Sequence, residues 1–167
     1  MNDVEIDKKI DKFLKEKEEI NMRKFEYVER IKGTTFDLPK RNTKCSGGYD
    51  FYNPETVTLN SGQIKHVKTG VKAYFPEDEI LMLCNRSSNP KKKGLILING
   101  VGIVDSDYAD NPDNEGEIAF AFMSIYGEPI TIEAGEKLGQ GIFVKYGITD
   151  DDSATGERTG GFGSTGK

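Results

Sequence analysis

The chain has 167 residues, a formal net charge of −5, 35% hydrophobic residues and 31% charged residues. This length predicts a single domain with a buried core, and the acidic balance argues against broad binding to nucleic acid, which requires a basic surface. No apolar run approaches the roughly 18 residues of a membrane span, and the charged N-terminus lacks the apolar centre of a signal peptide, so we expect a cytoplasmic protein that does not enter membranes.

Residues 3–24 are predicted to form an amphipathic helix. Apolar side chains recur along this segment at the spacing of one helix face, among many Lys and Glu residues. They are Ile6, Ile10, Phe13, Leu14 and Ile20. A single apolar stripe on a charged helix needs a cover, which we expect to be the body of the same subunit or a neighbour, with a separate protein partner as the alternative.

Residues 25–146 predict an all-β core. Short β-type runs separated by turn residues lie at 57–59, 64–75, 80–84, 94–98, 118–125 and 141–146. The second run is broken at Thr69-Gly70 and predicts two strands. Ile118, Phe120 and Phe122 alternate along the fifth run, which predicts one buried face. Many short strands without a strand–helix–strand rhythm indicate a sandwich or jelly roll and disfavour a Rossmann fold.

The remaining segment, residues 147–167, carries three consecutive Asp residues and then a stretch rich in Gly, Ser and Thr. This composition is typical of a flexible tail. The chain therefore divides into an N-terminal helical extension (1–24), a β-core (25–146) and a C-terminal arm (147–167).

The segment 99–108 is the most informative part of the core. It follows an apolar run and reads as a β-hairpin with polar groups at its edge. Asp105, next to the apolar pair Ile103-Val104, could hold a water molecule and act as a general base, and Tyr108 could form a wall for a flat ring. An acidic turn is the plainer interpretation. A calcium-binding loop is a third, weakened because Asp110 and Gly116 stand where that loop needs Gly and Glu.

Segment 99–108 resembles the third motif of the trimeric dUTPases, in which Asn, Gly, an apolar pair, Asp and Tyr recur at this spacing. Four further segments resemble the other motifs of that family and follow in the family's order. They are 47–50 (Gly-Gly-Tyr-Asp), 86–88 (Arg-Ser-Ser), 135–140 (Gly-Glu-Lys-Leu-Gly-Gln) and 158–166, the Gly-rich end. Five motifs in order identify the chain as resembling a phage or bacterial member of the family.

The resemblance implies an all-β jelly-roll barrel, here with the added N-terminal helix and flexible tail, and a homotrimer that binds dUTP. It implies hydrolysis of dUTP to dUMP and pyrophosphate with Mg²⁺ as cofactor, the metal being held mainly by the triphosphate and water rather than by direct protein ligands. It also implies that each site is built from three chains: one supplies segment 99–108, a second supplies 86–88 and Gln140, and a third supplies the tail.

The roles of individual residues also follow from the resemblance. Asp105 orients and deprotonates the attacking water, and Asp50 supports the network of metal, water and phosphate. Asn99 and the hairpin backbone at Gly102 read the uracil edge, while Tyr108 leaves no room for a 2′-hydroxyl. The remaining substrate-binding residues contact phosphate, or in the case of Phe162 stack on uracil: Arg86, Ser87, Ser88, Gln140, Arg158, Phe162, Gly163, Ser164 and Thr165.

Several positions depart from the family pattern. Lys137 stands where Arg is common, Gly139 where Ala is common, and residues 109–116 form an enlarged loop after Tyr108. The three lysines at 91–93 read most simply as a solvated loop, with added positive potential near phosphates as the alternative. His66 reads as a surface or packing residue.

Two alternatives to the hydrolase remain from the sequence. One is a regulatory protein on the same scaffold, which binds a repressor-like partner through the N-terminal helix or loop 109–116. The other is a dCTP deaminase, a related fold that also carries Arg-Ser-Ser but needs a Glu beside the base.

Overall fold

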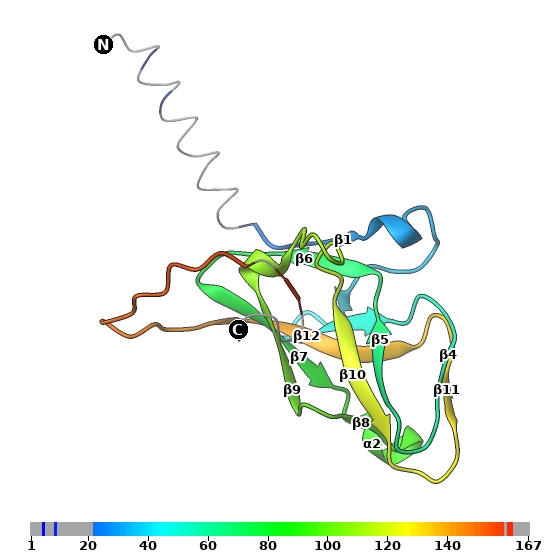
Figure 1. The fold of residues 1–167 in the computed structure, drawn as a ribbon. Coiled ribbons are helices and arrows are strands. Elements are labelled where there is room, and N and C mark those ends of the chain that lie inside the picture. The colour runs from blue at the N-terminus through cyan, green and yellow to red at the C-terminus, as the bar shows by residue number, and fades with distance from the viewer. Residues whose placement is uncertain (1–4, 6–8, 10–21, 159, 162–167) are drawn as a thin grey trace.

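The protein is described here from a computed structural model, which describes residues 5, 9, 22–158, 160 and 161 (Figure 1). Within these residues the regular secondary structure is mainly β-strand. They are β1 (Lys24–Tyr27), β2 (Lys40–Arg41), β3 (Tyr49–Tyr52), β4 (Val57–Leu59), β5 (Ile64–Lys68), β6 (Val71–Tyr74), β7 (Glu79–Asn85), β8 (Leu95–Leu97), β9 (Val101–Asp105), β10 (Ala119–Ser124), β11 (Ile130–Ile132) and β12 (Lys137–Lys145). The helical turns are η1 (Glu29–Ile31), α2 (Ser88–Lys93) and η2 (Ser106–Tyr108).

The strands form antiparallel sheets that wrap around one core, as a jelly roll does. The largest has the order β2-β3-β12-β7-β9, and a second has the order β5-β10-β8. Two small pairs, β1-β6 and β11-β4, complete the barrel (Figure 1). The all-β prediction is therefore confirmed.

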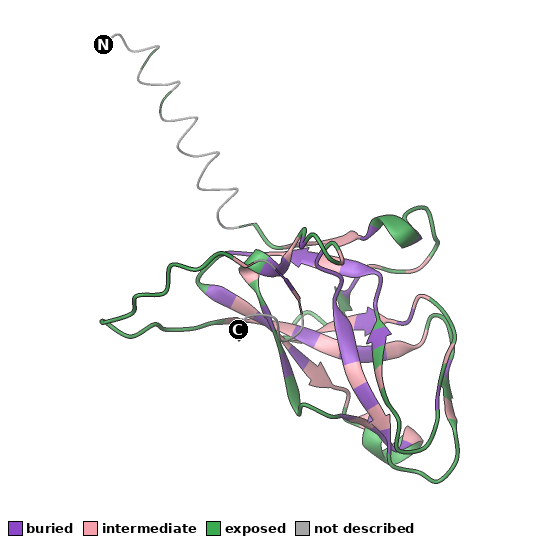
Figure 2. Cartoon of the chain, viewed as in Figure 1, coloured by how far each residue is buried: buried purple, intermediate pink, exposed green. Residues whose placement is uncertain are grey.

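The core lies between the two larger sheets, where the inward side chains are fully buried (Figure 2). Phe120 and Phe122 on β10 are both 0% exposed and Ile118 is 1% exposed, which confirms the predicted buried face. Phe120 meets Phe51 edge-on with ring centroids 5.6 Å apart. A Cβ atom at Gly139 would lie 2.2 Å from the Phe120 ring, so this aromatic ring occupies the space that the family's Ala would need.

The predicted runs 57–59 and 64–75 match β4, β5 and β6 closely, and the break at Thr69-Gly70 is confirmed by the positive φ of Gly70. The last run was predicted to begin at residue 141, but β12 begins at Lys137. The sequence did not reveal strands β1, β2, β3 and β11, which are short and gain their partners from distant parts of the chain.

The lysines at 91–93 were expected in a loop, and this expectation was wrong. They form the last turn of α2, which Gly94 closes in the left-handed conformation with φ of 59°. Pro90 is tolerated because it lies in the first turn, where a backbone N–H has no partner within the helix.

The N-terminal helix was predicted to reach residue 24, and this end point was wrong because β1 begins at Lys24. Most of segment 3–21 lies outside the described residues; Glu5 and Lys9 are described and are helical. After β12 the chain extends away from the barrel and then turns back over β9 (Figure 1). Within the described residues, no helix has the length and apolar composition that crossing a lipid bilayer requires.

Candidate functional site

Segment 99–108 forms one side of a cavity of about 290 Å³. Asn99 and Gly100 make the turn into β9, and Gly100 adopts a φ of 68°. Along β9 the side chains alternate, so Val104 is buried while Asp105 reaches solvent at the end of the strand. The cavity combines polar groups of segment 99–108 with apolar walls from other strands. Its lining residues include Leu83, Leu97, Asn99, Gly102, Asp105, Tyr108, Ile118, Ala119, Ala121 and Arg158.

Tyr108 lies in the turn η2 and lines this cavity. The residue is 7% exposed, and burial raises the pKa of its hydroxyl. The side-chain amide of Asn114 donates a hydrogen bond to the Tyr108 Oη atom at 2.6 Å, and the hydroxyl in turn donates to the backbone oxygen of Glu117 at 3.5 Å. The enlarged loop 109–116 therefore holds Tyr108, which lines the cavity.

The tail returns to the same cavity. Arg158 donates from Nε to the Asp107 Oδ1 atom at 2.7 Å and from Nη2 to Asp105, and its guanidinium carbon lies 5.8 Å from the centre of the Tyr108 ring. The hydrogen bond to Asp107 raises the pKa of the Arg158 guanidinium. The resemblance implies a tail from a neighbouring chain, whereas here Arg158 contacts Asp105 of its own chain.

A second group of predicted residues gathers where β3, β7 and β12 lie side by side. Asp50 pairs in register with Gln140, its Oδ2 atom accepts a hydrogen bond from Lys137 Nζ at 2.6 Å, and its Oδ1 atom lies 3.7 Å from Arg86 Nε. A cavity of about 230 Å³ opens beside this cluster. Its lining residues are Arg86, Ser88, Asn89, Lys92, Lys93, Glu136 and Lys137.

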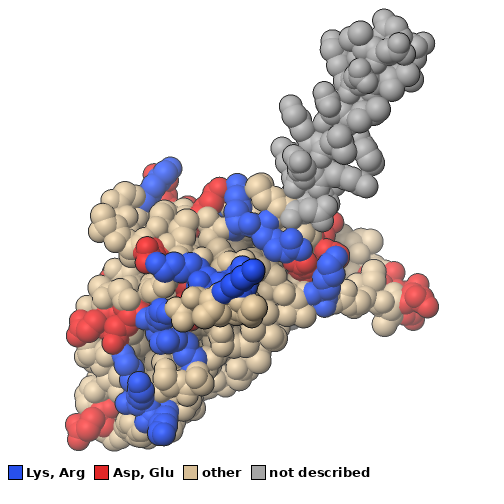
Figure 3. Space-filling view, turned by 180° about the vertical axis from the view of Figure 1, so that it is seen from behind, with Lys and Arg blue, Asp and Glu red and all other residues tan. Residues whose placement is uncertain are grey.

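Lys and Arg side chains gather on the face of the molecule that Figure 3 shows, which is the rear face in the view of Figure 1. Four cations line the small cavity against one carboxylate, so the cavity suits an anion with several negative charges. Ser87, the N-cap of α2, is exposed and makes no capping hydrogen bond from its side chain. Two lysines of α2, Lys92 and Lys93, line this cavity, in line with the alternative that these lysines add positive potential near phosphates.

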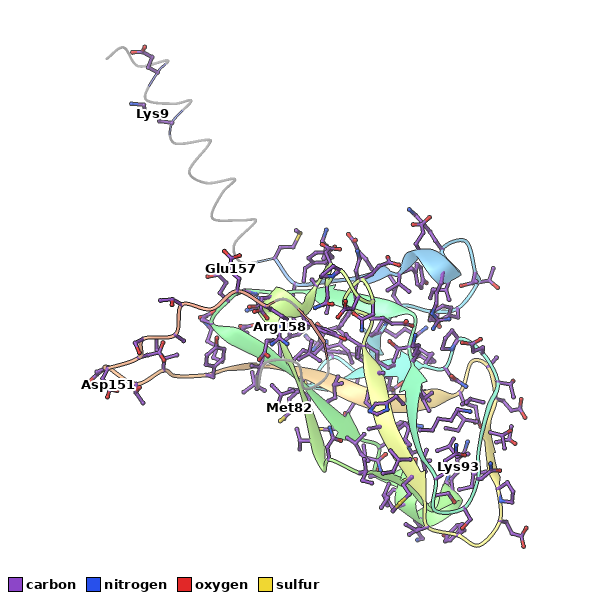
Figure 4. All side chains as sticks on the ribbon, viewed as in Figure 1. Lys9, Met82, Lys93, Asp151, Glu157 and Arg158 are labelled. Carbon is purple, nitrogen blue, oxygen red and sulfur yellow. The ribbon has the colours of Figure 1, made fainter. Side chains whose placement is uncertain are left out.

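The two groups lie far apart within one chain. On the antiparallel pair β7-β9, Asp105 lies opposite Ile80, whereas Arg86 follows the far end of β7. Arg86 is six residue steps beyond Ile80, a span of about 20 Å at ~3.3 Å per residue of extended chain. Arg158 and Lys93 accordingly lie toward opposite ends of the barrel (Figure 4).

The carboxylates of the calcium-loop interpretation have cationic and hydroxyl partners in the structure. Asp105 and Asp107 accept hydrogen bonds from Arg158, while Asp110 accepts them from Lys72 and Tyr74. In the part of the chain that the structure describes, no three His, Cys, Asp or Glu side chains form a group able to hold a metal ion.

Sequence reasoning missed one residue that lines the first cavity and one residue that holds its wall. His66 lies on β5 opposite Ala121 of β10 and lines the cavity, although it was expected to have only a surface or packing role. Asn114 was hidden in the enlarged loop, where only the Asn-rich turn composition marked it. Phe162, Gly163, Ser164 and Thr165 lie outside the described residues.

Comparisons with known proteins agree with this architecture. The dUTPase family model matches residues 34–166. The chain is 46% identical over 149 residues to the deoxyuridine 5′-triphosphate nucleotidohydrolase of Lactococcus lactis, covering 88% of this chain and 99% of the relative. It is 32% identical to the protein of the same name from Desulfitobacterium hafniense, covering 86% and 95%.

Solved structures show the same fold. The crystal structure of a dUTPase from Streptococcus mutans superposes with a TM-score of 0.71 at 42% identity, covering 75% of this chain and 98% of that one. A mutant dUTPase from phage phi11 of S. aureus, whose structure reveals the coordination of a structural Mg(II) ion, has a TM-score of 0.64 at 21% identity and covers 80% and 97%. The described fold, the five ordered motifs and the match over residues 34–166 show that this chain belongs to the dUTPase family.

Proposed function

We propose that this chain hydrolyses dUTP to dUMP and pyrophosphate at the cavity lined by Asn99, Asp105 and Tyr108. The observation that carries the proposal is the placement of an exposed carboxylate at the mouth of a cavity with a buried aromatic wall, in a chain of the dUTPase family. Such a cavity suits a flat base and a sugar, with the carboxylate left facing the phosphates.

The base and the sugar are read by different groups. Asn99 and the hairpin backbone at Gly102 supply donors and acceptors to the uracil edge. A Cβ atom at residue 102 would lie 3.2 Å from Leu83, so a side chain there would crowd the cavity. Tyr108, buried and held by hydrogen bonds, forms the wall that meets the deoxyribose and excludes a 2′-hydroxyl.

Asp105 acts on water. Its carboxylate accepts a proton from a water molecule as the oxygen of that water attacks the α-phosphorus, and the bond from this phosphorus to the bridging oxygen of pyrophosphate breaks. In the structure Arg158 donates a hydrogen bond to this carboxylate. Substrate binding therefore has to draw Arg158 from Asp105 to the phosphates, where its planar fork fits the γ-phosphate oxygens.

The cluster of Arg86, Gln140 and Lys137 binds phosphate oxygens together with Ser87 and Ser88. Asp50 holds Lys137 and Arg86 in place, since it contacts both cations. The remaining tail residues close over the nucleotide, with Phe162 on the uracil and the backbone of Gly163 and the hydroxyls of Ser164 and Thr165 on the phosphates.

Mg²⁺ fits this donor set as an ion that arrives on the triphosphate. Asp105 and Asp107 are exposed carboxylates whose oxygens could accept hydrogen bonds from its waters once Arg158 has moved. When bound, Mg²⁺ neutralises phosphate charge and so stabilises the leaving pyrophosphate.

A homotrimer completes the site. The separation of about 20 Å along β7 means that Asp105 of one chain needs the phosphate cluster of a neighbour. Val101 and Ile103 on the edge strand β9 are 42% and 54% exposed, an apolar strip beside the cavity that a neighbouring chain can cover.

Hydrolysis in water enriched in ¹⁸O tests the mechanism. Attack at the α-phosphorus places the label in dUMP, and mass spectrometry should find it there. Label in pyrophosphate instead would show attack at the β-phosphorus and would refute the proposed chemistry.

A further inference from the structure

We propose that Asn114 is a positioning residue, which locks the Tyr108 ring so that the cavity wall discriminates deoxyribose from ribose. The inference rests on the proposed hydrolysis of dUTP and assigns a task to the loop 109–116. Its basis is the 2.6 Å hydrogen bond from the Asn114 side-chain amide to the Tyr108 hydroxyl.

The orientation of the Asn114 side chain is determined at both ends. Its Oδ1 atom accepts a hydrogen bond from the backbone N–H of Gly116 at 3.0 Å. An amide whose oxygen is used in this way must present its NH₂ group on the other side, where Tyr108 lies. Asn114 therefore acts as a donor to the phenol oxygen, and the phenol hydrogen remains directed at the Glu117 backbone oxygen.

The loop that carries Asn114 is itself firmly held. The backbone N–H of Asn114 donates to the oxygen of Asn111 at 3.2 Å, and Asn111 is 4% exposed. Asp110, at the other end of the loop, accepts hydrogen bonds from Lys72 and from Tyr74 at 2.8 Å on β6. The amide of Asn114 is thus fixed to the barrel rather than carried on a loose segment.

The residue that accepts the hydrogen bond from the Tyr108 hydroxyl is also anchored. Glu117, whose backbone oxygen receives the phenol hydrogen, has a side chain 4% exposed that accepts hydrogen bonds from Arg30 at 2.5 Å and from the backbone N–H of Gly70 at 2.8 Å. Tyr108 is therefore held between two fixed points. A wall fixed in this way resists the small ring displacement that a 2′-hydroxyl would demand.

The C-terminal arm passes close to Asn114 and Tyr108. A Cβ atom at Gly161 would lie 3.5 Å from the Tyr108 hydroxyl oxygen and 3.8 Å from the Asn114 amide nitrogen. The hydrogen bond between Asn114 and Tyr108 therefore lies next to Gly161 of the C-terminal arm. Loop 109–116, the Tyr108 ring and the arm are in contact there.

Asn114→Leu removes the donor and keeps a similar volume. The free energy of one hydrogen bond corresponds to about a 2- to 10-fold change in an equilibrium or a rate. We therefore expect the ratio of kcat/KM for dUTP to kcat/KM for UTP to fall by about that factor. The fall should come mainly from a higher kcat/KM for UTP. Asn114→Asp should restore only part of the ratio, because the Tyr108 hydroxyl can donate to the new carboxylate only by giving up its hydrogen bond to the Glu117 backbone oxygen.

Asp113→Asn is the matched control. It removes an exposed charge from the same loop and leaves in place the contacts of Asp110 to β6 and the contact of Asn114 to Tyr108. The ratio in this variant should equal the wild-type ratio. Equal ratios in Asn114→Leu and Asp113→Asn would overturn the positioning role.

A measurement without nucleotide separates this inference from the proposed function. In ¹⁵N–¹H spectra the side-chain amide signals of Asn114, identified by their loss in Asn114→Leu, should move in Tyr108→Phe. Unmoved signals would overturn the hydrogen bond. Wild-type protein that fails to hydrolyse dUTP would refute the proposed function and the sugar discrimination together, while the spectra would still decide the contact.

Discussion

Arg158 donates a hydrogen bond to Asp105 within one chain, and donates a second to Asp107 at 2.7 Å. The cation assigned to the γ-phosphate thus covers the carboxylate assigned to the attacking water. The two groups cannot perform both tasks while they are paired. A nucleotide triphosphate, with several negative charges, is the competitor that can separate them.

Asp105→Asn should leave dUTP binding nearly unchanged and lower kcat by about 10²- to 10⁴-fold, the usual contribution of a general base. Steady-state release of pyrophosphate measures kcat, and equilibrium titration with a non-hydrolysable analogue measures binding. Asp107→Asn is the matched control, because it removes another carboxylate that contacts Arg158. A kcat loss no larger in Asp105→Asn than in Asp107→Asn would sink the general-base assignment.

Deleting residues 157–167 should abolish turnover without unfolding the barrel. The deletion removes Arg158 and the rest of the Gly-rich arm, whose described residues belong neither to a strand nor to the hydrophobic core. Turnover is measured with dUTP, and size-exclusion chromatography with light scattering reports the assembled mass. Arg158→Ala in the full chain should share part of the defect. Full activity of the truncated chain would refute the role of the arm.

Gly116→Ala should lower the free energy of unfolding by about 1–3 kcal/mol or more. Gly116 has a φ of 75°, and a Cβ atom there would lie 2.3 Å from the backbone oxygen of Tyr108. Urea unfolding measures the change. Gly127→Ala is the control, because nothing lies within 4 Å of its added Cβ atom. An unchanged unfolding midpoint in Gly116→Ala would contradict the described path of the loop 109–116.

The contact between Asp110 and Lys72 predicts a pH-dependent contribution to stability. The hydrogen bond from Lys72 holds the pKa of the Asp110 carboxyl below its usual value. The carboxylate therefore stabilises the fold above the unfolded pKa of about 3.9, and this contribution is lost as the pH falls through the lower pKa of the folded state.

Asp110→Asn should accordingly unfold at lower urea than the wild type at about pH 7, and the two proteins should converge below about pH 3 as the wild-type carboxyl becomes protonated. The shift should be small, since the Asp110 side chain is 59% exposed. A gap that stayed constant across this pH range would show that the ion pair does not stabilise the fold.

Local pattern predicted much of the barrel. The alternation of Ile118, Phe120 and Phe122 reported a buried face correctly, and the break at Thr69-Gly70 was visible from turn composition. The helix α2 was missed because it is short and contains Pro90. Strand β11 has three residues and depends on pairing with β4, so no local pattern could reveal it.

The site was less accessible to pattern alone. Physical reasoning alone favoured an acidic turn over a reactive site for segment 99–108, and only the resemblance across five segments assigned its chemistry. The contact between Asn114 and Tyr108, the place of His66 in the cavity and the return of Arg158 all depend on tertiary structure. The distance of about 20 Å between Asp105 and Arg86 likewise follows from strand register, which the sequence does not display.

The most direct test of the account is pyrophosphate release from dUTP, dTTP, dCTP and UTP, each measured with and without Mg²⁺, with ammonia release followed in the dCTP sample. The account predicts fast release from dUTP with Mg²⁺, a large loss without the metal, and little release from the other three nucleotides. Comparable rates on all four nucleotides, or ammonia from dCTP in place of pyrophosphate from dUTP, would contradict it.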